Sequence, residues 1–153
     1  MAGIAERLAE LGIEIPEVSA PAGAYIPAIT HGDLVFTSGQ LPFVAGVLPA
    51  TGKVGAEVTP DDAKAYARIA AINALAAVQS VIGSLDRVTR IVKVTGFVAS
   101  AAGFNGQPGV INGSSELLAE IFGDAGVHAR SAVGVAELPL DSPVEVELTV
   151  SFA

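Results

Sequence analysis

The sequence predicts an α+β fold in which a mixed, mainly antiparallel sheet carries helices on one face. Short runs of alternating apolar residues are typical of strands, and two longer stretches repeat their apolar residues at three- and four-residue spacing. The predicted order is helix, hairpin, loop, helix, strand, helix and hairpin, with no internal repeat. With 153 residues, we expect a single domain over residues 1–153.

The first part of the chain is predicted to form a short helix and a hairpin. Residues 1–12 have an amphipathic pattern that ends at Gly12. Residues 25–29 and 34–37 are rich in strand-forming side chains, and a Gly-Asp turn signal lies between them. Residues 40–57 contain several prolines and glycines, which predicts a surface loop.

Two long helices are predicted in the middle of the chain. Thr59 supplies an N-cap, Pro60 suits the first helical position, and Gly83 is placed to end this helix. The apolar face of this helix contains Ile69, Ile72, Leu75, Val78 and Ile82. A glycine-rich turn at Gly103, Gly106 and Gly109 leads to a second helix, which Gly123 closes and which contains Leu117, Leu118, Ile121 and Phe122.

The remaining apolar runs are predicted to be strands. Residues 88–100 present apolar side chains to both faces, as in a central strand that is covered on both sides. Residues 130–136 and 144–152 are separated by a proline-containing connector, so we expect them to pair as a hairpin. In the last strand, valines and leucine alternate with polar residues, which gives it one apolar face.

Composition restricts the classes of partner. Hydrophobic residues make up 51% of the chain and charged residues only 16%, which favours self-association through apolar surface. The formal net charge of -8 disfavours binding to nucleic acid or to anionic membrane. No uninterrupted apolar stretch of about 20 residues and no leader pattern is evident, so we expect a cytoplasmic protein.

Arg130 and Glu145 are the candidate catalytic residues. Arg130 opens a predicted strand, and the small residues Ala132 and Gly134 on the same face leave room for a small ligand. A guanidinium group there could hold the carboxylate of an α-keto or α-imino acid, although pairing with Glu145 or Glu147 for structure is the alternative. Glu145 could move a proton if burial raises its pKa, or it could be a solvated or interface residue.

The other polar groups give weaker signals. His31 and His128 have no carboxylate or histidine partner at metal-ligand spacing, so we expect structural or solvated roles and no metal. The absence of cysteine excludes thiolate chemistry. With no nucleotide-binding or hydrolase motif, the sequence favours cofactor-free chemistry on a small anion.

Taken together, several segments resemble signatures of the RidA (YjgF) family, in the order in which that family carries them. They are Gly23-Ala24-Tyr25, the run from Leu34 to Pro42, Ala129-Arg130-Ser131-Ala132-Val133, Leu138-Pro139 and Val144-Glu145-Val146-Glu147. The resemblance covers residue 23 to the C-terminus. Each segment alone is common, but the set is specific.

The resemblance implies a fold similar to that of trimeric chorismate mutase, with active sites in clefts between the subunits of a homotrimer. It implies that Arg130 binds the substrate carboxylate and that Glu145 positions or activates water. By the same resemblance, Tyr25, Ser38, Gly39, Asn112 and Ala132 line the substrate site, with no cofactor. The chain departs from the family in two respects. Ala132 stands where many members of the deaminase branch carry cysteine, and the chain has an extra N-terminal helix over residues 1–12 and a longer segment over residues 103–109.

The activity that the resemblance implies is hydrolysis of reactive enamine or imine acids to a keto acid and ammonia, of the 2-iminobutanoate/2-iminopropanoate deaminase type. A trimer that binds a small carboxylate without turnover is the main alternative. Endoribonuclease or translation-inhibitor activity is disfavoured by the acidic composition. A mutase acting on a dicarboxylate would need a second arginine, and Arg87 and Arg90 are expected to be exposed.

Overall fold

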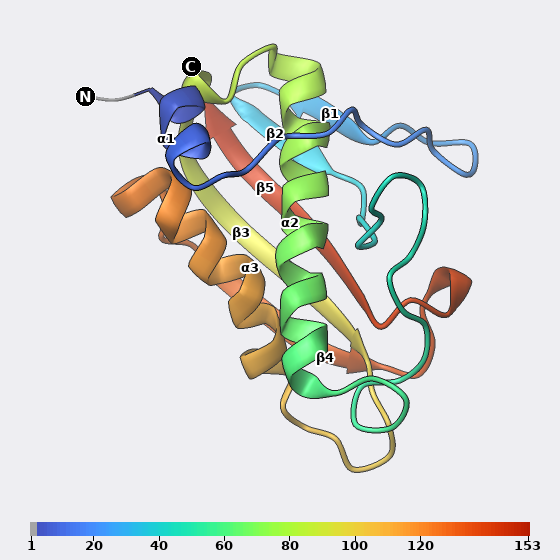
Figure 1. The fold of residues 1–153 in the computed structure, drawn as a ribbon. Coiled ribbons are helices and arrows are strands. Elements are labelled where there is room, and N and C mark those ends of the chain that lie inside the picture. The colour runs from blue at the N-terminus through green and yellow to red at the C-terminus, as the bar shows by residue number, and fades with distance from the viewer. Residues whose placement is uncertain (1–2) are drawn as a thin grey trace.

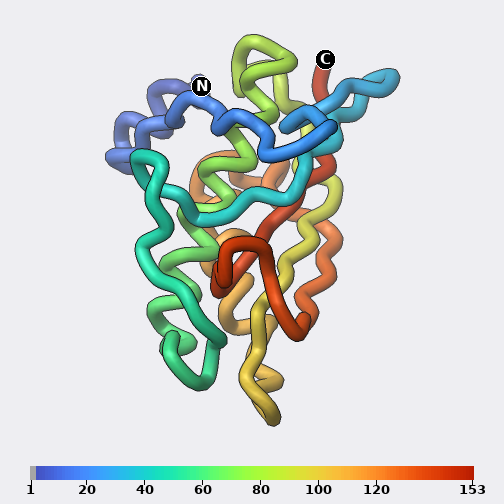
Figure 2. The backbone as a smooth tube through the Cα atoms, turned by 90° about the vertical axis from the view of Figure 1, so that its right-hand side faces the viewer, coloured from blue at the N-terminus to red at the C-terminus, as the bar shows by residue number. Residues whose placement is uncertain are grey.

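A computed structural model describes residues 3–153 and has a five-stranded sheet with helices on one face (Figure 1). The view turned by 90° shows the same two layers from the side (Figure 2). The sheet order is β1-β2-β5-β3-β4. The main elements are α1 (Ile4–Glu10), β1 (Ala28–His31), β2 (Leu34–Thr37), α2 (Pro60–Ile82), β3 (Val88–Ala99), α3 (Gln107–Phe122), β4 (Ala129–Val135) and β5 (Val144–Phe152).

The predicted α+β architecture with helices on one face is confirmed, but the last two strands do not form the expected hairpin. β4 pairs in parallel with β3, and β5 pairs antiparallel with both β2 and β3. The connection from β3 to β4 therefore runs through α3 as a crossover, which parallel pairing requires. This crossover brings α3 over β4, and it leaves β4 as an edge strand.

Helix boundaries follow the caps that the sequence contains. The Thr59 side chain accepts a hydrogen bond from the backbone N–H of Asp62 at 3.1 Å, and Gly83 ends α2 with a φ of 86°. Gly123 ends α3 with a φ of 58°. The helix predicted over residues 1–12 is α1, although residues 1 and 2 lie outside the described part of the chain.

The first hairpin and the second helix begin at other residues than expected. β1 starts at Ala28 rather than at residue 25, and it extends to His31, beyond the predicted end at residue 29. α3 starts at Gln107, so Gly109 lies inside the helix and not in the preceding turn. Pro108 occupies the first turn of α3, where a missing N–H costs no helical hydrogen bond.

α2 is long and apolar enough to cross a membrane by length and composition, but it lies across the sheet (Figure 1). Its buried face is built mostly from alanine, which allows close approach to the strands. The buried alanines are Ala63, Ala67, Ala70, Ala71, Ala74, Ala76 and Ala77. α2 is therefore the core helix of this domain.

β3 is central in the sheet but is covered on one face only within the chain. Ile91, Val94 and Val98 are fully buried under the helices, whereas Val92 is exposed. A register shift against β5 between Ile91 and Lys93 reverses the alternation predicted at this point. Phe97 lies on the opposite face of the sheet and is half-buried. Within residues 3–153, no helix covers that face (Figure 2).

Candidate functional site

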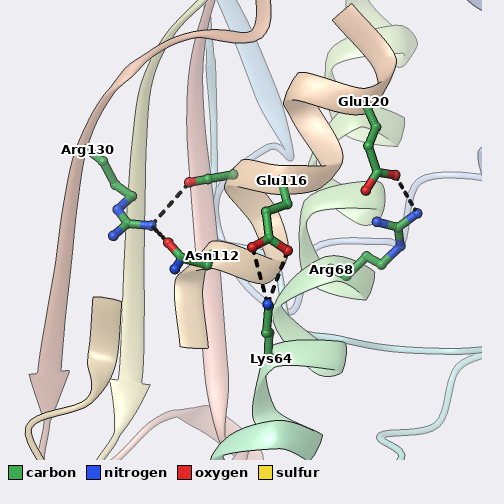
Figure 3. Close-up of polar contacts among 7 residues, drawn as sticks. Lys64, Arg68, Asn112, Glu116, Glu120 and Arg130 are labelled. Atoms are coloured by element: carbon green, nitrogen blue, oxygen red, sulfur yellow. Dashed lines mark hydrogen bonds and ion pairs between the residues drawn. The ribbon is translucent and has the colours of Figure 1, made fainter. Parts of the chain in front are cut away.

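Arg130 lies on the helix-covered face of the sheet, close to its free edge. Arg130 pairs with Val94 of β3, and Val94 is buried under the helices. Because directly paired residues of neighbouring strands point to the same face, the guanidinium group is directed toward α3. Figure 3 shows it reaching Asn112 on that helix.

One nitrogen of Arg130 makes both of its hydrogen bonds to α3. Nη1 donates to Oδ1 of Asn112 at 2.8 Å and to Oγ of Ser115 at 3.2 Å. Asn112 and Ser115 are three positions apart, so they lie on one face of the helix. The guanidinium group carries five N–H donors, and these contacts use the two on Nη1.

The other two nitrogens of Arg130, Nε and Nη2, are open to solvent. Within residues 3–153 they have no hydrogen-bond partner, and no side-chain nitrogen or oxygen is both buried and without a partner. The four ion pairs of the described chain do not include Arg130. Arg130 is thus not paired with Glu145 or Glu147, and its side-on pair of donors has the geometry that a carboxylate accepts.

Ser115 continues this network to His128. Oγ of Ser115 lies 2.9 Å from Nε2 of His128, and Nδ1 of His128 lies 2.6 Å from the carbonyl oxygen of Gly126. Gly126 itself is held tightly, since a Cβ there would lie 2.3 Å from the backbone carbonyl oxygen of Leu118. His128 is therefore fixed between the middle of α3 and the turn that precedes β4.

Glu145 lies on the opposite face of the sheet. It pairs with Phe97 of β3, and it alternates with the fully buried Val144 and Val146 of its own strand. Burial raises the pKa of the Glu145 carboxyl above its usual value, and the neighbouring charge of Glu147 raises it further. A carboxyl group with a raised pKa is suited to taking up and giving back a proton.

Gly39 is the residue that makes room for Glu145. A Cβ on Gly39 would lie 2.6 Å from Cδ and 2.9 Å from Oε1 of Glu145, so any side chain there would displace the carboxyl group. Gly39 and Glu145 line a cavity of about 310 Å³, together with Tyr25. The other lining residues are Ser19, Ala20, Pro21, Ala22, Pro27, Gln40, Leu41, Phe43, Pro139 and Leu140.

A buried asparagine holds one wall of this cavity. Nδ2 of Asn73 in α2 donates to the carbonyl oxygens of Leu41 at 2.9 Å and Phe43 at 3.0 Å. Asn73 is only 8% exposed and supplies a donor to both carbonyl groups; that of Leu41 also accepts from the backbone N–H of Phe43 at 2.9 Å, so the carbonyl of Phe43 depends more on Asn73. The sequence pattern placed an apolar helix here and gave no role to Asn73.

Ser38 and Ala132 are the remaining predicted site residues, and each contacts a neighbouring part of the chain. The hydroxyl group of Ser38 donates to the carbonyl oxygen of Ile26 at 2.6 Å, which ties the segment containing Tyr25 to the end of β2. Ala132 follows Arg130 on the same face and packs against the core. The room expected beside Gly134 is filled, because a Cβ there would lie 2.7 Å from Nε2 of Gln107.

The structure thus gathers the expected residues into two groups. Arg130 and Asn112 lie on the helix face, near the free edge of β4. Tyr25, Gly39 and Glu145 line a cavity on the other side of the sheet. The sheet separates the two groups within one chain. Among the described residues, no group of three or more metal-ligating side chains is present.

Comparison with known proteins assigns the chain to a family. Residues 5–152 match the family model described as YjgF/chorismate mutase-like, putative endoribonuclease. The chain belongs to the YjgF/RidA family. A YjgF/RidA relative, protein TCP17 of Trypanosoma cruzi, is 42% identical over 152 residues, which is 97% of this chain and 94% of that protein.

Other members of the YjgF/RidA family have named activities or solved structures. The 2-iminobutanoate/2-iminopropanoate deaminase of Escherichia coli is 35% identical over 131 residues, 84% of this chain and 89% of that enzyme. The crystal structure of the protein Atu1372 from Agrobacterium tumefaciens, whose function is unknown, aligns with a TM-score of 0.91 at 40% identity. That alignment covers 98% of this chain and 92% of the other.

Ser115 and His128 were not among the site residues predicted from the YjgF/RidA resemblance. The sequence predicts a structural or solvated role for His128 and no role for Ser115. The spacing of Asn112 and Ser115 on one helix face was a usable signal, because a polar pair three residues apart interrupts an apolar helix. The contact with His128 depends on the crossover, which local pattern does not reveal.

Proposed function

We propose that the protein hydrolyses small enamine or imine acids to the keto acid and ammonia. The observation that supports this most directly is which nitrogens of Arg130 are hydrogen-bonded and which are free. Its Nη1 is anchored by the neutral groups of Asn112 and Ser115, while Nε and Nη2 are free and open to solvent. A planar pair of donors with an unneutralised positive charge suits a carboxylate, which every such substrate carries.

Glu145 is proposed to transfer the protons. Water attacks the imine carbon, and a C–O bond forms as the C=N π bond breaks; ionised Glu145 takes a proton from this water and passes it to the nitrogen, which gives a neutral carbinolamine. Glu145 then takes the hydroxyl proton and passes it to the nitrogen as the C–N bond breaks and the carbonyl of the keto acid forms, so the nitrogen leaves as ammonia. The raised pKa of Glu145 supports both steps, since proton transfer is most efficient when the pKa approaches the working pH.

This reaction needs Arg130 and Glu145 at one substrate, so we propose that two copies of the chain complete each site. Arg130 lies at the unpaired edge of β4, where a second copy could approach. The helix-free face of the sheet carries exposed apolar residues that suit self-association: Ile29, Phe36 and Val133. A homotrimer with three such clefts is the assembly we propose, located in the cytoplasm.

The direct test couples a pyridoxal-phosphate dehydratase acting on serine or threonine to this protein and follows release of the keto acid. We expect the wild type to accelerate release and Arg130→Ala to abolish the acceleration. Arg68→Ala, which removes an arginine that pairs with Glu120 on the helix surface, is the matched control and should retain the activity. A wild type without any effect on several amino-acid-derived imines would contradict the proposal.

A binding protein without turnover is the second candidate, and the separation of the two groups favours it specifically. The donors of Arg130 are complete within one chain and do not involve Glu145. In that case Glu145→Gln would leave keto-acid binding and every measured rate unchanged. An RNA substrate is disfavoured by the net charge of -8, which repels a phosphate backbone.

A further inference from the structure

The hydrogen bonds that connect Gly126, His128, Ser115 and Arg130 allow one consistent assignment of donors and acceptors. The carbonyl of Gly126 can only accept, so Nδ1 of His128 must carry the hydrogen in their 2.6 Å contact. In the neutral ring, Nε2 is then an acceptor, and the hydroxyl group of Ser115 donates to it across 2.9 Å. The hydroxyl hydrogen of Ser115 therefore points toward Nε2 of His128.

This order determines what Ser115 offers to Arg130. With its hydrogen directed at His128, the Ser115 oxygen presents lone pairs to Nη1 of Arg130 at 3.2 Å. Without an acceptor at His128, the hydroxyl group could rotate and point its hydrogen toward the guanidinium group, where it would oppose the N–H donor. The histidine therefore keeps the serine in the orientation that Arg130 needs.

Fixing both hydrogens of Nη1 fixes the plane of the whole guanidinium group, because that group is rigid and flat. The direction of the free Nε and Nη2 donors follows from this plane. A carboxylate held by two parallel hydrogen bonds is sensitive to such a direction, so a loosened plane would weaken binding. The anchor of the plane comes from neutral side chains and leaves the positive charge available for the ligand.

We propose that His128 is a positioning residue for the carboxylate-binding donors of Arg130 and that it acts through Ser115. The inference rests on the proposed function for the identity of the ligand, a small 2-keto or 2-imino acid. Within the described residues His128 makes no hydrogen bond to Arg130, and its proposed effect is transmitted by Ser115. It has two separable contacts, one that fastens the turn before β4 and one that orients Ser115.

Two variants separate these contacts. In His128→Asn the amide lies near the position of Nδ1, so it can still bond to Gly126 but does not reach Ser115. In His128→Gln the longer side chain places its amide oxygen near the position of Nε2, so it can accept from Ser115 but loses the Gly126 contact. If His128 has only a structural role, the asparagine variant should bind the ligand more nearly as the wild type does. If His128 positions Ser115, the glutamine variant should do so.

The experiment measures pyruvate binding by calorimetry, kcat and KM with an imine generated in situ, and Tm, for the wild type and each variant. We expect His128→Asn and Ser115→Ala to raise the Kd for pyruvate about tenfold, as loss of one hydrogen bond to a charged group predicts. His128→Gln should bind within about twofold of the wild type, a rescue that depends on the acceptor. KM should follow Kd, with a smaller change in kcat.

A double variant tests whether His128 acts through Ser115. If it does, Ser115→Ala with His128→Asn should bind pyruvate no more weakly than Ser115→Ala alone. Equal Kd values for the asparagine and glutamine variants, or additive losses in the double variant, would overturn the inference. A wild type that binds pyruvate but hydrolyses no imine would refute the proposed function and leave the positioning role intact, because binding is measured separately.

Discussion

At the scale of single residues, Arg130 differs from the arginines that pair with carboxylates. Arg87 and Arg90 are also held by neutral carbonyl groups, but both are exposed, whereas Arg130 is half-buried. Arg68 and Arg7 each lie about 3 Å from a carboxylate oxygen, of Glu120 and Glu10 respectively, so their charge is balanced at the surface. Arg130 is held instead by the neutral groups of Asn112 and Ser115. Its positive charge is not balanced within the chain, and an anionic ligand would supply the missing partner.

A lysine at position 130 tests whether geometry or charge binds the ligand. Arg130→Lys keeps the positive charge, but an ammonium group cannot bond to Asn112 and also present two parallel donors to a carboxylate. We expect the Kd for pyruvate to rise at least about tenfold, measured by calorimetry. Arg68→Lys should leave the Kd unchanged. Full affinity in Arg130→Lys would mean that charge alone binds the anion.

Glu145 should make stability depend on pH in a direction opposite to that of an ordinary paired carboxylate. Its pKa is raised in the folded state, so the folded chain binds this proton more tightly than the unfolded chain. The stabilisation is complete below the unfolded value of about 4.3 and is lost as the pH rises through the folded pKa. At neutral pH the ionised, half-buried carboxylate therefore destabilises the fold.

The corresponding measurement is the Tm of Glu145→Gln as a function of pH. At pH 7 we expect this variant to melt about 1–3 °C above the wild type, a small gain because solvent screens the half-exposed group. The gain should disappear near pH 4, where the wild-type carboxyl is protonated. Glu6→Gln, on the exposed surface of α1, should show no gain at either pH. A Tm difference that stays constant with pH would exclude ionisation as its cause.

At the scale of elements, the ends of a helix can be predicted from the sequence because nearby residues determine them. The pairing of strands that are distant in the sequence cannot be predicted in this way. The caps at Thr59 and Gly83 determine the ends of α2, so both could be read from the sequence. β4 and β5 were expected to pair because they are neighbours in the chain. β4 pairs in parallel with β3 instead, a choice made by the packing of α3 that no turn signal between the strands encodes.

Helix α2 also has a part in the site, through Asn73. In Asn73→Ala the carbonyl groups of Leu41 and Phe43 lose their shared donor, so we expect a loss of about 1–3 kcal/mol in unfolding free energy. The cavity wall should also loosen and raise KM. Ser80→Ala removes only a bond within the same helix and is the control. Denaturant unfolding and steady-state kinetics measure the two effects, and unchanged values of both would remove Asn73 from the site.

At the scale of the whole molecule, the sheet determines how the site can be assembled. The alternation along β5 correctly predicted that Glu145 faces away from the apolar side, and residue pattern alone suggested that Arg130 binds a carboxylate. That the two residues lie on opposite faces depends on the parallel register of β3 and β4, so it could not be read from either strand alone. Only the family resemblance anticipated a site shared between subunits.

A shared site predicts that two inactive variants restore each other. Arg130→Ala supplies an intact Glu145 group, and Glu145→Gln supplies an intact Arg130 group, so mixed assemblies contain some sites with both. If copies mix at random in equal amounts, about a quarter of the sites are complete, and we expect about a quarter of the wild-type rate after dissociation and reassembly.

The control for this mixing experiment combines Arg130→Ala with a chain that carries both substitutions. No copy in that mixture has an intact Arg130, so no site can be complete and the rate should stay at background. If the Arg130→Ala and Glu145→Gln mixture also stays at background although mass measurement shows mixed assemblies, each site must lie within one chain. That outcome would require Arg130 and Glu145 to act together across the sheet, which their placement on opposite faces opposes.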